Sequence, residues 1–263
     1  MAVLFLDFDG VVLDSAGETA ITAWRGGQEL WPREWSGDMP PQWLIESFRS
    51  LRPLLHTGYE AFGLLRLAWL AGERQAARLE PSEENRRRAS ELLTETGVDR
   101  ERLVELFGST RDHWLRTDFQ GWLQANRFYP GVAEMLKQRL RQSRPQVYIL
   151  TTKQERFVFA LAEHAGFKLE RQNVFGLDTG RSKKSHLLEL VQKHKDTGEE
   201  LCFIEDRLPT LEEMTEEPRL NDLRLRLADW GYVTPDDVAK VSRIPRISSL
   251  SLDEFLSLLD GGD

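Results

Sequence analysis

The chain has 263 residues, of which 40% are hydrophobic and 30% charged, a balance typical of a globular protein with a buried core. Its formal net charge of −8 argues against unassisted nucleic-acid binding, which needs clustered lysine and arginine. No apolar run approaches the roughly 18 residues that cross a bilayer, and the single cysteine excludes an internal disulfide. We therefore expect a cytoplasmic protein with neither a nucleic-acid nor a membrane partner.

The first predicted element is a short apolar strand over residues 2–6, which ends abruptly in Asp7-Phe-Asp9-Gly10. At the carboxyl end of a strand, Asp7 is placed to face a ligand, with Asp9 two residues later, and Gly10 permits a tight turn there. Such an aspartate can attack a phosphoryl group, while a second carboxylate protonates the leaving oxygen and then activates water. Taken alone, Asp-x-Asp-Gly fits a calcium-type turn or an acidic loop equally well.

Between residues 16 and 127 no comparable strand pattern occurs. Helical spacing instead predicts helices over roughly 17–30, 41–56, 58–79, 83–96 and 99–118. So long a helical stretch after the first strand of a parallel sheet predicts a separate helical module. Seven of the eight tryptophans lie in it, and burial preference places most of them in its core.

One segment of this module gathers charged, aromatic and hydrogen-bonding side chains around a predicted helix break. These side chains are Arg49, Arg52, His56 and Tyr59. Guanidinium groups suit anionic substrates, so the segment is our candidate for the surface that recognises the substrate. Salt bridges within the module and a capped turn are the simpler interpretation of the same residues.

Strand patterns return after residue 128. Short apolar strands are predicted at 146–150, 201–204 and 223–228, separated by helical patterns such as 132–140, 157–165 and 187–191. This alternation predicts an α/β fold with a mostly parallel sheet and crossover helices. Each strand ends in polar residues, at the edge where ligands bind in such sheets.

Two of these strand ends and one helix start complete a candidate phosphate and metal site. Thr151 and the amides beside it, including that of Thr152, are placed to hold phosphate oxygens. Either Lys183 or Lys184, at the start of a helix, can neutralise a phosphate.

A further strand ends in Glu205-Asp206, which can complete a site for Mg²⁺, a cation that prefers oxygen ligands. Each residue also has a simpler explanation: Thr151 as a helix N-cap, the lysines on a solvated surface, and the acidic pair in an exposed turn. Because all of them occur in this order and at strand ends or a helix start, we favour a single site over these separate explanations.

In this order the residues resemble the motifs of the haloacid dehalogenase superfamily of phosphotransferases, and the resemblance covers essentially the whole chain. Four segments match the motifs in chain order: Asp7-Phe-Asp9-Gly-Val-Val-Leu-Asp-Ser, the strand 147–150 ending in Thr151, Lys183, and Phe203-Ile-Glu205-Asp206. Two further segments also resemble the family: Tyr129-Pro-Gly-Val, which precedes the strand 147–150, and Asp229-Trp-Gly-Tyr, which follows the last motif.

The resemblance implies a Rossmann-like catalytic core of residues 1–15 and 128–263, and a type-1 helical cap of residues 16–127 that governs substrate specificity. It also implies a role for each matching residue. Asp7 is the nucleophile and a metal ligand; Asp9 is the general acid/base, with its backbone carbonyl on the metal; Thr151, Thr152 and Lys183 bind phosphate; and Asp206, with Glu205, ligates Mg²⁺.

One departure and two exclusions refine this expectation. Family members usually carry a second acid about four positions after Asp206, where this chain has Thr210, and Glu205 is the available substitute. Asp9 favours phosphoryl transfer over dehalogenation. The absence of lysine from residues 15–128 disfavours a phosphonate hydrolase, which forms a Schiff base with a cap lysine.

The sequence therefore predicts a Mg²⁺-dependent phosphatase that hydrolyses a small phosphorylated metabolite through an aspartyl-phosphate intermediate. Two alternatives remain: a sugar-phosphate mutase of the same fold, and a catalytically weak binding or regulatory protein, which the acid missing at Thr210 supports. Phosphoglycolate, sugar phosphates and nucleotides are all open as substrates.

Overall fold

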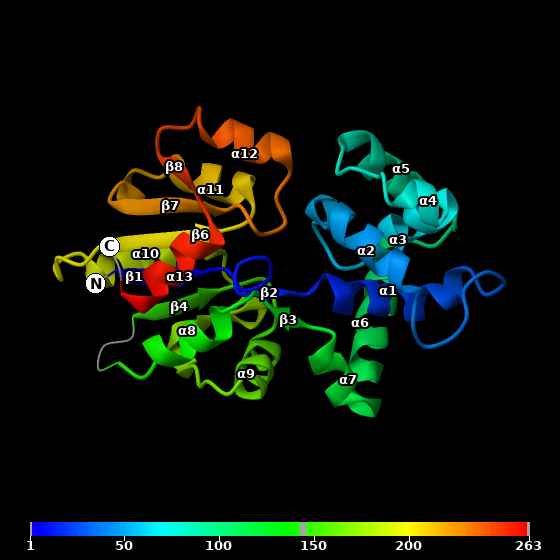
Figure 1. The fold of residues 1–263 in the computed structure, drawn as a ribbon, viewed down its shortest axis with the longest axis horizontal. Coiled ribbons are helices and arrows are strands. Elements are labelled where there is room, and N and C mark those ends of the chain that lie inside the picture. Colours follow the sequence, from blue (N-terminus) through cyan, green and yellow to red (C-terminus); the bar gives the residue numbers. More distant parts are fainter. Residues whose placement is uncertain (1, 143–145, 262–263) are drawn as a thin grey trace. The chain divides into compact units, whose positions relative to one another are not determined.

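The computed structural model describes residues 2–142 and 146–261, and the chain divides into two compact units (Figure 1). The core unit comprises Met1–Asp14 and Arg127–Asp263, and the helical unit comprises Ser15–Asn126. The predicted core also takes in residues 1, 143–145 and 262–263, which lie outside the described residues.

A six-stranded sheet forms the centre of the core unit, and every pairing in it is parallel. Its order is β5 (Val174–Phe175), β4 (Val147–Leu150), β1 (Val3–Leu6), β6 (Leu201–Glu205), β7 (Leu223–Ala228) and β8 (Ile247–Leu250). This confirms the predicted α/β fold with a parallel sheet.

The register of the central strand brings the polar strand ends together. Leu6 of β1 lies opposite Ile149 of β4 on one side and Ile204 of β6 on the other. Because all three strands run in the same direction, the residues that follow them emerge at one edge of the sheet.

Helices cover both faces of this sheet. They are α8 (Val132–Arg139), α9 (Glu155–His164), α10 (Lys183–His194), α11 (Leu208–Thr215), α12 (Pro235–Val241) and α13 (Leu252–Asp260), with the short 3₁₀ turns η2 (Arg171–Asn173), η3 (Leu177–Thr179) and η4 (Pro218–Leu220). Val3 and Phe5 point to the face where apolar side chains of α10, α11 and α12 complete the core. Elsewhere in the core unit, α8 and α13 pack side by side. Alternating strand residues thus supply both layers with apolar contacts.

A short antiparallel ribbon marks where the chain leaves and re-enters the core unit. It pairs β2 (Leu13–Asp14) with β3 (Arg127–Phe128). The helical unit lies between these two strands in the sequence.

The helical unit contains α1 (Ala16–Leu30), α2 (Gln42–Leu51), η1 (Arg52–Leu54), α3 (Glu60–Ala71), α4 (Glu73–Ala76), α5 (Glu83–Thr94), α6 (Arg100–Thr117) and α7 (Phe119–Gln124). The helix predicted over 58–79 is broken at Gly72, whose φ of +71° is a left-handed conformation that favours glycine. Ser82 and Asp99 cap α5 and α6 by accepting a hydrogen bond from a backbone N–H of the first turn. The sequence did not predict α7.

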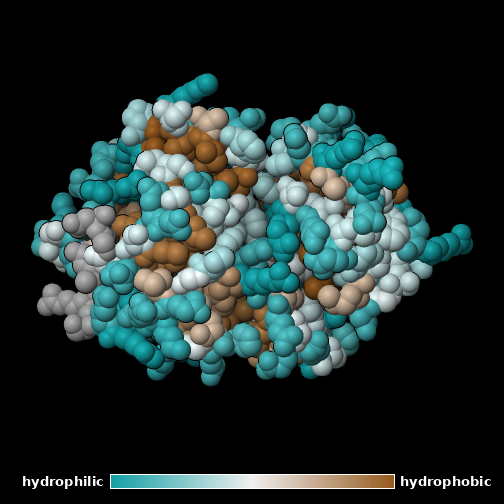
Figure 2. Space-filling view, viewed as in Figure 1, coloured by the Kyte–Doolittle hydropathy of each residue, from teal (hydrophilic) through white to brown (hydrophobic). Residues whose placement is uncertain are grey.

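Aromatic rings and matched charges hold the helical unit together. Four of its tryptophans are buried and three are half-buried; Trp24 and Trp35 stack with ring centroids 4.9 Å apart. Glu18 of α1 is fully buried and accepts two hydrogen bonds from the guanidinium of Arg111 on α6, at 2.8 and 2.9 Å. Side chains on the surface of this unit seen in Figure 2 are mostly hydrophilic. Within the described ranges, no helix combines the length and apolar character needed to span a bilayer.

Candidate active site

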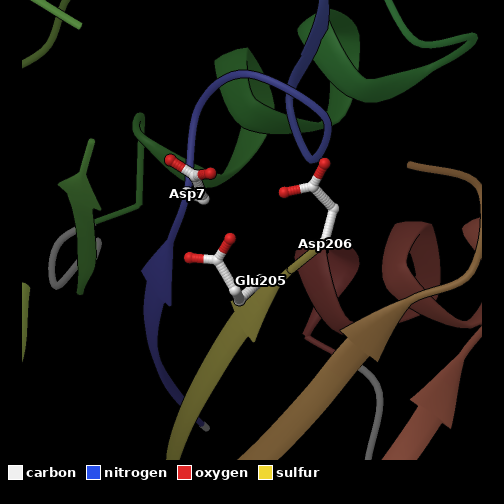
Figure 3. Close-up of side chains that lie close together, drawn as sticks. All are labelled: Asp7, Glu205 and Asp206. Carbon is white, nitrogen blue, oxygen red and sulfur yellow. The ribbon is translucent and has the colours of Figure 1, made fainter. Parts of the chain in front are cut away.

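Three buried carboxylates converge at the carboxyl edge of the sheet. Asp7 follows β1, while Glu205 and Asp206 stand at the end of the neighbouring strand β6 (Figure 3). Each offers an oxygen, and these oxygens all lie within 4.8 Å of one another. Their side chains are almost inaccessible, so the three charges lie close together in a region of low dielectric.

Lys183 is the cation that bridges this carboxylate cluster. Its Nζ lies 2.9 Å from Oδ1 of Asp7 and 2.6 Å from Oε2 of Glu205. It is the first residue of α10, and the Ser182 hydroxyl fixes that helix start by accepting a hydrogen bond from the N–H of Ser185. Lys184 instead lies 3.7 Å from Glu213, so of the two candidate lysines Lys183 is the one at the cluster.

The electrostatics of the cluster show an excess of negative charge. The pKa of Asp7 is raised from 3.8 to about 7, because burial and the charge of Glu205 together outweigh Lys183, which lowers it. Burial and the charge of Asp7 raise the pKa of Asp206 to about 6. Burial alone would lower the pKa of Lys183, but Asp7 and Glu205 outweigh it and raise that pKa, so the lysine stays protonated. Three carboxylates against one lysine leave room for a further positive charge.

The donor atoms and the shape of the cluster suit a small, hard divalent cation. All the offered ligand atoms are carboxylate oxygens, as Mg²⁺ prefers. The turn after Asp9 approaches them closely: a Cβ placed on Gly10 would lie 2.0 Å from Oδ2 of Asp206, and Gly10 has a φ of +93°. Only glycine allows this approach, which brings the backbone of the turn beside the Asp206 carboxylate.

Asp9 lies at the same edge and contacts a residue that the sequence analysis missed. Its Oδ1 lies 3.0 Å from Nζ of Lys153, whose side chain is only 7% exposed. Lys153 is held by its backbone, since its N–H donates to the Thr151 hydroxyl and its carbonyl accepts from the N–H of Leu177. Its position three residues beyond Leu150, the last residue of β4, was the available signal.

Thr151 is buried at the end of β4, where its N–H donates to the carbonyl of Phe175. It is not the N-cap of α9, because Gln154 occupies that position. Its hydroxyl instead faces the turn that carries Lys153. Thr152, also predicted to bind phosphate, is exposed in this turn.

A turn after β7 touches both the cluster and the loop after β1, a role that sequence reasoning did not find. The N–H of Tyr232 donates to Oδ2 of Asp206 at 3.0 Å, and the indole N–H of Trp230 donates to the carbonyl of Val11 at 3.1 Å. Thr210, at the position of the missing acid, lies in the first turn of α11, where its N–H donates to the carbonyl of Arg207.

The four candidate residues of the helical unit form a looser set. Arg49 on α2, Arg52 in η1 and Tyr59 before α3 are half-buried, and His56 is exposed. The carboxylate of Glu60 accepts hydrogen bonds from the N–H groups of His56 and Thr57, so the turn between them is capped.

This unit also contains a pocket of about 940 Å³. Tyr59 lines it, but all its lining residues belong to the helical unit, and the carboxylate cluster takes no part in it. The pocket is therefore a separate feature from the candidate active site.

Comparison with known proteins identifies the family. The sequence model of the haloacid dehalogenase-like hydrolases matches residues 1–212. This chain belongs to that family. The matched segment includes Asp7, Lys183, Glu205 and Asp206, which the fold gathers at the carboxyl edge of the sheet. A search of curated proteins gave no match.

Several solved structures share the fold over nearly the whole chain. A structure described as a predicted phosphatase from Clostridium acetobutylicum has a TM-score of 0.57 and 13% identity, covering 98% of this chain and 97% of the other. A family member from Streptococcus pneumoniae has a TM-score of 0.55 and 16% identity, covering 98% of both chains. A predicted phosphoglycolate phosphatase from Haemophilus somnus has a TM-score of 0.53 and 15% identity, covering 98% and 96%. At these identities the likeness shows a common fold.

Proposed function

We propose that this hydrolase is a Mg²⁺-dependent phosphatase that cleaves a small phosphomonoester through a covalent phosphoryl intermediate on Asp7. The observation that carries the proposal is the buried cluster of Asp7, Glu205 and Asp206, bridged by Lys183 and flanked by Asp9. Such an excess of buried charge is costly unless ligands compensate it, and it is typical of functional sites.

The chemistry assigned to Asp7 follows from its hydrogen bonds. Its Oδ1 accepts from the N–H of Phe8 at 2.7 Å and lies 2.9 Å from Nζ of Lys183. These contacts fix the carboxylate, so we assign the attack on phosphorus to Oδ2. The new bond joins Oδ2 to phosphorus while the bond from phosphorus to the ester oxygen breaks.

Asp9 moves the protons of both steps in this proposal. It gives a proton to the departing ester oxygen and then takes one from the water that attacks the phosphorus. The second displacement releases inorganic phosphate and restores the Asp7 carboxylate. Lys153, 3.0 Å from Asp9, holds the Asp9 side chain at the edge of the sheet.

Asp7, Asp206 and the backbone carbonyl of Asp9 are the proposed holders of Mg²⁺. When bound, the cation neutralises the negative charge of the phosphoryl group and the carboxylates. Glu205, predicted as a further ligand, accepts hydrogen bonds from Nζ of Lys183 through Oε2 and from the N–H of Arg207 through Oε1. We propose that Glu205 acts chiefly by holding Lys183 toward the phosphate, which Thr151 and Thr152 also contact.

The hydrogen bond from Tyr232 to Asp206 counts against the alternative hypothesis, in which the protein is a catalytically weak binding or regulatory protein of the same fold. That alternative depended on the acid missing at Thr210. Since the Tyr232 N–H holds the Asp206 carboxylate, the site does not depend on residue 210 to orient this group. We further propose that the helical unit is the cap that recognises the leaving group, with Arg49 and Arg52 as its anion-binding side chains.

Replacing Asp7 tests the proposed function. We expect wild-type protein to hydrolyse an aryl phosphate in the presence of Mg²⁺, and Asp7→Asn to lose more than about 10³-fold in kcat, roughly 4 kcal/mol of barrier. Asp222→Asn, at an exposed position before β7, is the matched control and should retain full activity. Equal activity of Asp7→Asn and wild type would refute the nucleophile. A wild-type protein that neither cleaves a panel of phosphate esters nor binds Mg²⁺ would refute the phosphatase.

A further inference from the structure

The turn Asp229–Tyr232, which follows β7, lies between the carboxylate cluster and the loop after β1. It donates one hydrogen bond to each side: the Tyr232 N–H to Oδ2 of Asp206, and the Trp230 indole N–H to the carbonyl of Val11. The phenol of Tyr232 adds a third, to Oδ1 of Asp14 at 2.8 Å. The turn therefore ties Asp206 to the loop that carries Asp9.

Two glycines face each other in this contact and leave no spare volume. A Cβ placed on Gly231 would lie 2.4 Å from the carbonyl oxygen of Gly10 and 2.5 Å from Cβ of Asp206. A Cβ placed on Gly10 would lie 2.0 Å from Oδ2 of Asp206 and 3.0 Å from the ring of Tyr232. The spacing between Asp206 and the Gly10 backbone is thus set by direct van der Waals contact through the turn.

The turn is itself anchored to the core unit away from the cluster. The ring of Trp230 stacks on Phe255 of α13, with centroids 5.1 Å apart and planes 16° apart, and the N–H of Asp229 donates to the carbonyl of Leu250 in β8. Because β8 and α13 fix the turn, Asp206 and the loop are held in place without help from a ligand. A site held in this way loses less entropy when its ligand binds.

We propose that the turn Asp229–Tyr232 is a positioning element that sets the affinity of the active site for its divalent cation. The Tyr232 N–H orients the Asp206 carboxylate, and the contact between Gly10 and Gly231 fixes the distance from that carboxylate to the backbone of the Asp9 turn. The inference rests on the proposed function, because it takes Asp206 to be a holder of Mg²⁺.

Gly231→Ala is the sharpest test, because the added methyl group pushes Gly10 and Asp206 apart without removing a polar group. We expect the Kd for Mg²⁺, measured by titration calorimetry without substrate, to rise at least about 10-fold. At saturating Mg²⁺, kcat should return to within a few-fold of wild type, whereas general misfolding would not be rescued. The control is Gly108→Ala on α6, where no atom lies within 4 Å of an added Cβ, and its Kd should be unchanged.

Trp230→Phe and Tyr232→Phe keep the test decisive if Gly231→Ala does not fold. Each removes one side-chain hydrogen bond, to Val11 in the loop after β1 or to Asp14 in β2, and keeps an aromatic ring. We expect each to raise the Kd about 3-fold. Wild-type protein that binds no Mg²⁺ would refute the proposed function itself. Wild-type protein that binds Mg²⁺, with folded variants of the turn that bind it equally well, would overturn this inference alone.

Discussion

The core unit and the helical unit place their candidate functional residues in different ways. In the core unit, parallel strands deliver Asp7, Thr151 and Glu205 to one edge of the sheet, so position along the chain largely determines position in space. In the helical unit, Arg49 and His56 were selected by residue type and by their place around a predicted helix break. The structure leaves Arg49 half-buried and His56 exposed. A parallel sheet has an edge where side chains converge, and a group of helices has none.

The two units also differ in how their buried charges are matched. In the helical unit, Glu18 is paired with Arg111, and Arg66 with Glu34, each by two hydrogen bonds. In the core unit Lys183 pairs with Asp7 and Glu205, and Asp206 adds a third buried carboxylate beside them. Matched buried charges indicate structural pairs, whereas an excess of one sign indicates a place for a ligand.

The largest expected effect is that of replacing Lys183, which tests whether the excess buried charge of the core unit marks a functional site. We expect Lys183→Met to lower kcat/KM about 10²–10³-fold, roughly 3–4 kcal/mol, because it removes the cation between Asp7 and Glu205. Lys184→Met is the matched control: this neighbour pairs with Glu213 outside the cluster, and its loss should change activity less than about 2-fold. Steady-state kinetics with an aryl phosphate decides between the two, and equal losses would show that the assignment to Lys183 is wrong.

The buried pair in the helical unit should affect stability and leave the chemistry intact. Glu18→Gln leaves Arg111 without its carboxylate, so we expect the free energy of unfolding in urea to fall by about 2–4 kcal/mol. Glu105→Gln breaks an exposed pair with Arg102 and should leave the free energy of unfolding almost unchanged. Below the unfolding transition, both variants should hydrolyse an aryl phosphate at the wild-type rate. A large loss of kcat in a stable Glu18→Gln protein would show that this buried pair affects catalysis, and the contrast between the two units would be wrong.

The sequence predicted the fold well wherever a local pattern was strong. The apolar runs of β1, β4, β6 and β7 were all found, because each is a short buried strand bounded by polar residues. The two-residue strand β5 is too short for any periodicity, and its pairing with β4 depends on tertiary context. Gly72 lies within a helical pattern, and only its left-handed conformation shows that the helix ends there.

The strand-end residues of the site could be predicted from the sequence. Its contacts between residues far apart in the sequence could not. Asp7 and Asp206 follow apolar strands and could be found by position. Lys153 lies near a strand end but was missed, because its role shows only in its pairing with Asp9, 144 positions away in the chain. The same holds for Tyr232, whose contact with Asp206 uses a backbone N–H that every residue except proline carries.

The excess charge of the cluster predicts an unusual pH dependence of the metal-free protein. Asp7 has a pKa raised from 3.8 to about 7, so its contribution to stability is complete below pH 3.8 and is lost as the pH rises through about 7. We expect Asp7→Asn to stabilise EDTA-treated protein by about 1–2 kcal/mol at pH 8 and by less at pH 5.

Thermal unfolding of both proteins from pH 5 to pH 8 measures this difference. Mg²⁺ should restore the stability of the wild type at pH 8 and have little effect on the variant. A metal-free wild type that gains stability relative to Asp7→Asn as the pH rises would contradict the excess negative charge.

The smallest effect concerns the helical unit, where the proposed recognition of the leaving group depends on half-buried arginines. If Arg52 contacts an anionic part of the substrate, Arg52→Ala should raise KM for the best substrate of a phosphate-ester panel about 3–10-fold, up to roughly 1 kcal/mol. Its kcat for a simple aryl phosphate should not change, since Asp7 and Lys183 remain. Arg88→Ala on α5, at an exposed position paired with Glu91, is the control. If Arg52→Ala and Arg88→Ala have the same KM on every ester of the panel, substrate recognition lies elsewhere, and Arg52 is structural like Arg111.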